Sequence, residues 1–170
     1  MSETHVKGLA DLQKFLDELP AKLERNVMRG ALRAGATQEL LPEAQANLLS
    51  AGAVKTGELI AGLKVKTGAR GGRVTASVVA TGKHAYIARF LEYGVKSHLI
   101  AAKNKKELFF AGSFIKSVRH PGIRAKGYMR RALDGRAQQA VIAAGNYIKN
   151  RLATKQGLDT SAVLIEGDQA

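Results

Sequence analysis

Cysteine and tryptophan are absent from this 170-residue chain, and aromatic residues make up only 5% of it. The lack of cysteine excludes disulfide bonds, thiol catalysis and thiolate metal sites, and it fits a reducing compartment or a protein indifferent to one. Because aromatic side chains are scarce, alanine, leucine and valine must fill the interior, which predicts close approaches between helices. The hydrophobic fraction of 45% is still high enough to exclude a fully disordered chain.

Long apolar runs are also missing, because no stretch approaches the roughly 18 to 20 residues that span a bilayer. The N-terminus lacks the basic segment and apolar stretch of a signal peptide. We therefore expect a soluble protein with no membrane partner. Since domains cluster near about 100 to 150 residues, we predict a single α+β domain over residues 1–153 and a polar tail or docking arm over residues 154–170.

Positive charge is concentrated in one part of the chain. The formal net charge is +13, and residues 51–155 alone hold 21 basic and 4 acidic residues. Residues 1–50 are nearly neutral, with 6 basic and 7 acidic residues, and residues 156–170 are acidic. Such a basic region attracts phosphate backbones, anionic membranes or acidic protein surfaces, and composition does not choose among them.

Apolar residues at three- and four-residue spacing predict three long helical segments. The first lies within residues 1–19 and ends near Pro20. The second is a long N-terminal helix from about residue 20 to residue 50, which Pro42 should kink because proline removes a backbone hydrogen bond. The third is a C-terminal helix from about residue 127 to residue 153.

Alternating apolar residues and glycine-rich turns predict strands between these helices. Residues 62–67 and 73–80 form a predicted hairpin around a glycine-rich turn. A short helix then ends at Gly94, and three short apolar stretches before the turn "HPG" at residues 120–122 are predicted strands. The predicted fold class is α+β, with the long N-terminal helix and the C-terminal helix packed on a small, mainly antiparallel β-sheet.

Candidate catalytic and metal-ligating residues are scattered along the chain. No histidine has another histidine or an acid at a four-residue spacing, no serine stands in a nucleophile elbow, and the acids of the basic region are unpaired. We therefore expect no catalytic site, no metal site and no cofactor. The residues considered are His84, His98, His120, Ser113, Ser117, Glu58, Glu92, Glu107 and Asp134.

Two features could bind phosphate groups. The segment "GARGGR" at residues 68–73 could offer backbone amides, but it lacks the lysine and hydroxyl of a P-loop, so a hairpin turn with solvated arginines is the better interpretation. The segments 103–106 and 124–136 could contact duplex DNA without sequence preference. Aromatic residues that would stack on the bases of a single strand are not interleaved with them, which argues against a dedicated single-strand binder. The candidate contacts with DNA or an acidic partner are Arg70, Arg73, Lys103, Lys105, Lys106, Arg124 and Lys126.

Glu92, in "YIARFLEYGVKSHLI", is an acid within the most basic part of the chain. It could pair with Arg89 one helical turn earlier, or lie in solvent, and either arrangement contributes little stability. It could instead reach a basic group on the segment that follows or on another subunit. The sequence leaves these alternatives open.

Three segments in order resemble a tail-component family of long-tailed bacteriophages, often called gene-product-ten-like. They are "KTGELIAGLKVKTG", "AYIARFLEYGVKSHLIAAKNKKELFF" and "SVRHPGIRAKGYMRRALDG", and the resemblance covers about residues 20 to 150. Val95, Gly127, Tyr128 and Arg131 depart from the family pattern, although Tyr128 keeps an aromatic residue at its position. The resemblance assigns structural or interface roles to Tyr86, Phe90, Glu92, Gly94, His120, Pro121, Gly122, Tyr128 and Arg130.

The resemblance implies a virion structural protein of the neck or upper tail, a tail-completion or head-tail connector subunit without catalysis. It implies a six- or twelve-fold homo-oligomeric ring around the DNA channel, with neighbouring neck, tail-terminator or tail-tube proteins as partners and genomic DNA in the lumen. Assembly would take place in the host cytoplasm.

The alternative to this structural role is a basic, non-specific DNA-binding protein. Within the structural interpretation, we predict that Tyr86 and Phe90 pack against the long helices and that Glu92 anchors a basic residue such as Arg130.

Overall fold

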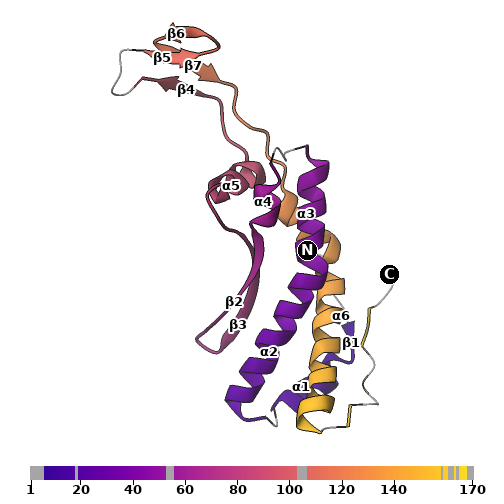
Figure 1. The fold of residues 1–170 in the computed structure, drawn as a ribbon. Helices are drawn as coiled ribbons and strands as arrows, with labels where there is room; N and C mark the ends of the chain where they lie inside the picture. Colours follow the sequence, from indigo (N-terminus) through magenta and orange to yellow (C-terminus); the bar gives the residue numbers. More distant parts are fainter. Residues whose placement is uncertain are drawn as a thin grey trace.

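The computed structural model describes residues 6–17, 19–52, 56–102, 107–157, 159–160, 163 and 165–167, and its class is α+β as predicted. A body of helices and one long hairpin carries a smaller group of strands that projects from one end (Figure 1). The helices are α1 (Leu9–Asp17), α2 (Ala21–Gly35), η1 (Ala36–Leu40), α3 (Leu41–Ser50), α4 (Glu58–Ala61), α5 (Ala85–Tyr93) and α6 (Tyr128–Gln156).

Helices α2, η1 and α3 follow one another without a break, and η1 is a π-helical turn just before Pro42. The N–H of Leu41 donates to the carbonyl of Ala36, five residues earlier. A proline in a regular helix clashes with the carbonyl four residues before it, and a wider turn gives that carbonyl room. The sequence thus places a local change of helix type at Pro42, whereas the kink itself stays a prediction.

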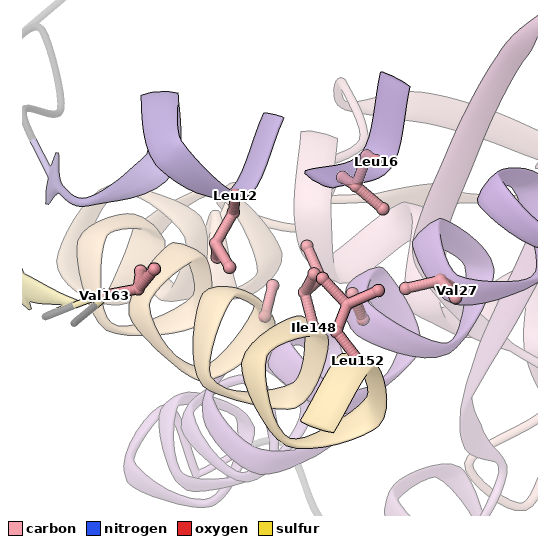
Figure 2. Packing of buried hydrophobic residues seen from close by; sticks show 8 residues of the cluster. Leu12, Leu16, Val27, Ile148, Leu152 and Val163 are labelled. Carbon is pink, nitrogen blue, oxygen red and sulfur yellow. The ribbon is translucent and has the colours of Figure 1, made fainter. Parts of the chain in front are cut away.

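The first hydrophobic core joins α1, α2 and α6. Figure 2 shows leucines of α1 pointing toward side chains of α2 and α6, with Val163 closing one side. Burying one such aliphatic side chain contributes roughly 1.5–3 kcal/mol, so this cluster supplies much of the stability of the helical body. Its buried members are Leu12, Leu16, Val27, Ala31, Ala144, Ile148, Leu152 and Val163.

Glycine allows α2 and α6 to approach closely. A Cβ atom on Gly35 would collide with the backbone carbonyl of Ala140, and one on Gly30 would collide with the ring of Tyr147. This contact confirms the close helix approaches that the shortage of aromatic residues predicts. Arg136 of α6 also forms an ion pair with the next helix, its Nε atom lying 3.1 Å from the carboxylate of Glu43 in α3.

The second core lies where α3, α5 and the start of α6 meet the long hairpin. Strands β2 (Leu63–Arg70) and β3 (Arg73–Ala80) pair antiparallel in the register Val65 with Val78, which confirms the predicted hairpin. The hairpin runs beside α2 (Figure 1). The buried members of this core are Ala44, Leu48, Leu63, Ala88, Leu91, Tyr128 and Ala132.

The remaining strands also pair antiparallel, but the pairs are separate and do not build one shared sheet. Among the described residues, β4 (His98–Ala101) pairs with β7 (Ser117–His120), and β5 (Leu108–Phe110) pairs with β6 (Ser113–Ile115). The prediction of antiparallel pairing is confirmed. The helices pack mainly on one another because each pair is too narrow to cover them.

Both ends of the chain differ in detail from the predicted helix and tail. Strand β1 (Val6–Lys7) precedes α1 and pairs with β8 (Glu166–Gly167). Helix α6 runs past residue 153 to Gln156, and Val163 is buried in the first core. The described part of the tail therefore packs against its own body, while the single-domain boundary at residue 153 stays a prediction.

The close contact of α2 and α6 predicts opposite effects for two glycine-to-alanine substitutions. Gly35→Ala should destabilise the protein by about 1–3 kcal/mol, because the added methyl group overpacks the helix contact. The matched control, Gly135→Ala, has open space around the new Cβ atom. It should stabilise α6 by up to about 1 kcal/mol through helix propensity. Urea unfolding of both variants measures the difference, and equal effects of the same sign would contradict the proposed contact.

Candidate functional site

The end of α5 and the start of α6 lock together in a junction that we call the clasp, residues 91–95 and 122–131. Val95 and Ile123 exchange two backbone hydrogen bonds of 2.8 Å. Gly94 and Gly122 have positive φ values of 76° and 92°, and a Cβ atom on either would meet backbone of the opposite segment. Only glycine fits both positions, which explains the turn glycines noted in the sequence.

Glu92 caps the N-terminus of α6. Its carboxylate oxygens accept hydrogen bonds from the backbone N–H groups of Met129, at 2.8 Å, and Arg130, at 3.2 Å. The local N-cap residue is Gly127 in the left-handed conformation, which has no side chain to accept these bonds. A carboxylate at this position also offsets the positive end of the helix dipole.

The hydrogen bonds of the clasp run in both directions. The N–H groups of Lys126 and Gly127 donate to the carbonyls of Leu91, at 2.7 Å, and Glu92, at 3.3 Å. These carbonyls belong to the last turn of α5 and would otherwise lack partners within that helix. The incoming segment therefore caps α5 while α5, through Glu92, caps α6.

The predicted contact of Glu92 with Arg130 is present, but it is made through the backbone. The carboxylate accepts a hydrogen bond from the N–H of Arg130, whose side chain is exposed. The packing prediction for α5 is wrong, because Tyr86 and Phe90 are exposed on α5 and their rings contact each other at 5.9 Å. The buried face of α5 instead consists of Ala88 and Leu91.

Tyr128 is the aromatic centre of the clasp and is 0% exposed. Its hydroxyl has no hydrogen-bond partner among the described residues. Burial, together with the nearby charge of Glu92, raises the pKa of Tyr128 to about 12. Both causes disfavour the tyrosinate, so the ring acts as a large apolar side chain that happens to carry a hydroxyl.

Beyond the clasp, β4–β7 form the projection seen at the top of Figure 1, which we call the arm. At its base the rings of His98 and His120 stack at 5.0 Å across the first residue pair of β4 and β7. The N–H of Gly122 donates a hydrogen bond of 3.0 Å to Nδ1 of His120. The "HPG" turn, with Pro121 exposed, thus fixes where the arm leaves the body.

The arm carries exposed aromatic side chains that the sequence analysis did not single out. Phe109 and Phe114 are 68% and 69% exposed, and their rings lie 5.2 Å apart as a cross-strand pair. Three of the five phenylalanines of the chain lie in the arm, including Phe110. This concentration of phenylalanine around the short turn "AGS", in a chain with few aromatic residues, is the sequence signal that could have indicated an exposed aromatic surface.

The described basic candidates do not form one patch. Arg70 and Arg73 are exposed at the turn of the β2–β3 hairpin, whereas Arg124 and Lys126 are exposed at the clasp. The eight-residue strands between these places span roughly 25 Å. Lys103, Lys105 and Lys106 lie outside the described residues. A single flat surface for duplex DNA is therefore not assembled from these side chains.

Other kinds of site find no support in the described part of the chain. Within it, no group of three or more histidine or acidic residues is placed to hold a metal ion. No helix of that part is long and apolar enough to cross a membrane.

Residues 10–94, half of the chain, match the model of the family described as "Bacteriophage HK97-gp10, putative tail-component". The chain belongs to this family. Its description as a phage tail component implies a place in the virion among other phage structural proteins. No curated protein and no solved structure is significantly similar to the chain. The match ends at the first residues of the clasp, so the arm and α6 lie outside it.

Removing the capping carboxylate should weaken the clasp. Glu92→Ala is expected to destabilise the protein by about 1–2 kcal/mol, as loss of a helix cap does. Glu92→Gln keeps an acceptor oxygen without the charge and should cost less. Glu58→Ala is the control, since Glu58 is exposed and contacts His84 outside the clasp. Chemical unfolding of the three variants would refute the capping role if Glu92→Ala and Glu58→Ala behaved alike.

The raised pKa of Tyr128 predicts a loss of stability at alkaline pH. Between pH 10 and 12 an unfolded tyrosine releases its proton while folded Tyr128 keeps it, so the free energy of unfolding should fall by about 2–3 kcal/mol. Tyr128→Phe lacks this contribution and, because no partner is lost, should be as stable as the parent at pH 7. Unfolding curves of both proteins from pH 8 to 12 test this, and parallel pH profiles would disprove it.

Proposed function

We propose that this tail-component family member is a tail-completion or head-tail connector subunit of the phage neck or upper tail. It acts by assembling into a closed ring around the DNA channel, six- or twelve-fold, and it performs no catalysis. The observation that carries the proposal is the arm, which holds its aromatic side chains in solvent at a distance from both cores. Exposed apolar patches of this kind mark interaction surfaces.

The clasp supports the same role because it fixes the arm to the body. Backbone hydrogen bonds between Val95 and Ile123 and the stacked histidine pair hold the arm at its base. A ring requires a reproducible angle between the two surfaces that each subunit offers its neighbours. An arm held by ordered hydrogen bonds suits that requirement better than one on a flexible linker.

The basic charge suits a subunit that surrounds DNA or contacts acidic neighbouring proteins. Positive charge is spread between the hairpin turn and the clasp, and a distributed field of this kind attracts a phosphate backbone without forming a dedicated binding site. The same charge supports the alternative function, non-specific DNA binding, whose mark is affinity that falls steeply with salt.

Cryo-electron microscopy of intact particles that contain the protein tests the proposal. We expect its density as a closed ring at the head-tail junction, with the DNA channel through the centre. A protein absent from assembled particles, whose isolated form binds duplex DNA tightly at low salt, would favour the alternative. Density elsewhere in the tail would keep the family assignment and reject the neck position.

A further inference from the structure

The helical body contains an open apolar groove of about 410 Å³ between α1, α2, η1 and α6. Its walls are almost entirely aliphatic, and they include Leu9 and Leu16 of α1, Met28 of α2 and Ala137 and Val141 of α6. Among the described residues that line it, Gln13 has the one polar side chain. Apolar grooves of this size are typical of binding sites, so this groove can accommodate an apolar group.

The same chain presents an apolar group of matching character on the arm. Phe109 and Phe114 form an exposed pair on one face of the β5–β6 hairpin. The hairpin turn holds Ala111 at a φ of 50°, the only non-glycine positive φ among the described residues. A two-residue turn of this kind keeps the two strands, and therefore the two rings, in a fixed relation.

The arm and the groove lie at different ends of the molecule. The arm projects beyond α5, whereas α1 lies at the far end of α2 and α6 (Figure 1). The aromatic pair therefore cannot reach the groove of its own chain while the clasp is closed. Two complementary surfaces separated in this way make a head-to-tail contact between copies, and such a contact closes into a ring when the rotation allows it.

We propose that the groove receives the Phe109–Phe114 tip of the arm of a second copy of this chain. The proposal deepens the ring assembly proposed above, because it names the contact between neighbouring subunits. The charges of α1 are mixed, because exposed Asp11 pairs with Lys14 at 3.7 Å. Asp17, also exposed on α1, is opposite in charge to exposed Lys116 and Arg119 of the arm. Opposite charges around an apolar centre orient two partners as they meet.

The expected contact is small. An aromatic side chain buries roughly 150–250 Å², so two rings withdraw roughly 300–500 Å² of one partner, below the roughly 800 Å² per partner of a stable complex. One arm in one groove is therefore weak. In a closed ring each copy makes the contact twice, and the last subunit joins two neighbours at once.

The absence of cysteine makes the contact testable by disulfide trapping in the full chain. One variant carries Phe114→Cys in the arm, and a second carries Ala137→Cys in the groove, with tags of different size. Mixed under mild oxidation, they should form the heterodimer in several-fold higher yield than Ala137→Cys mixed with Leu49→Cys. Leu49 is an exposed apolar residue of α3 that does not line the groove.

Two further measurements separate the possible occupants. Adding Phe109→Ser to the arm variant should reduce the trapped heterodimer to the level of the Leu49 control, with an unchanged circular dichroism spectrum. Ala137→Cys in the monomer should react readily with a thiol reagent, because the groove is then open. Slow labelling would show that the chain's own segments fill the groove and would overturn the proposal. Dominant homodimers of Phe114→Cys would also overturn it, in favour of arm-to-arm contact.

The outcome can be distinguished from that of the ring proposal. A ring at the head-tail junction together with heterodimer at control level would reject the arm-in-groove contact and keep the ring. Strong trapping without a ring in particles would keep the contact and reject the closed assembly.

Discussion

The hydrogen bonds that the first turn of α6 donates to the carboxylate of Glu92 are the interaction on which the rest of the structure depends. They join the end of α5 to the start of the longest helix, and the arm emerges between these two points. Gly127 is left-handed and has no side chain, so a distant residue has to supply the cap. The carboxylate stands in a basic part of the chain because the helix end needs a negative partner there.

The few aromatic residues of the chain are distributed unevenly between the core and the arm. Inside the body, Gly30, Gly35 and Ala31 leave room for α6, so the core is built from close backbone contacts and aliphatic side chains. Tyr128 is the only aromatic residue among the fully buried side chains of the described chain. The three phenylalanines of the arm are exposed instead, and large rings give more contact area per residue than other side chains.

Much of the fold follows from local patterns in the sequence. Alternating apolar residues over residues 62–67 and 73–80 predict a hairpin, and β2 and β3 pair there in the structure. The three- and four-residue spacing of apolar residues predicts the C-terminal helix in the same way, and α6 is found there. The burial of α5 could not be predicted this way. A helical stripe that includes Tyr86 and Phe90 indicates an apolar face, but the face that packs is decided by which side fits the neighbouring helices, and small Ala88 fits.

The site was partly predictable for a related reason. Gly94, Gly122 and Tyr128 were singled out by the resemblance, and each has a structural role in the clasp. Arg130 was correctly predicted as a partner of Glu92, but the kind of contact was not predictable. Charge patterns suggest side-chain partners, whereas a helix N-terminus offers backbone N–H groups that leave no mark in the sequence. The exposure of Phe109 and Phe114 could not be predicted from the local pattern. Apolar and polar residues alternate in the same way in a strand that faces a core and in a strand that faces a partner.

A weak contact between copies would have a physical advantage for a ring-forming tail component. Apolar surface that binds strongly in the monomer would drive open chains at the concentrations of an infected cell, because a head-to-tail contact has no built-in end. The proposed contact, limited to two aromatic rings, would be too weak to drive such open chains. It would become stable only when several copies meet on a common partner, where each bond raises the effective concentration of the next. Under this proposal, the small size of the arm tip would tie assembly to the growing particle.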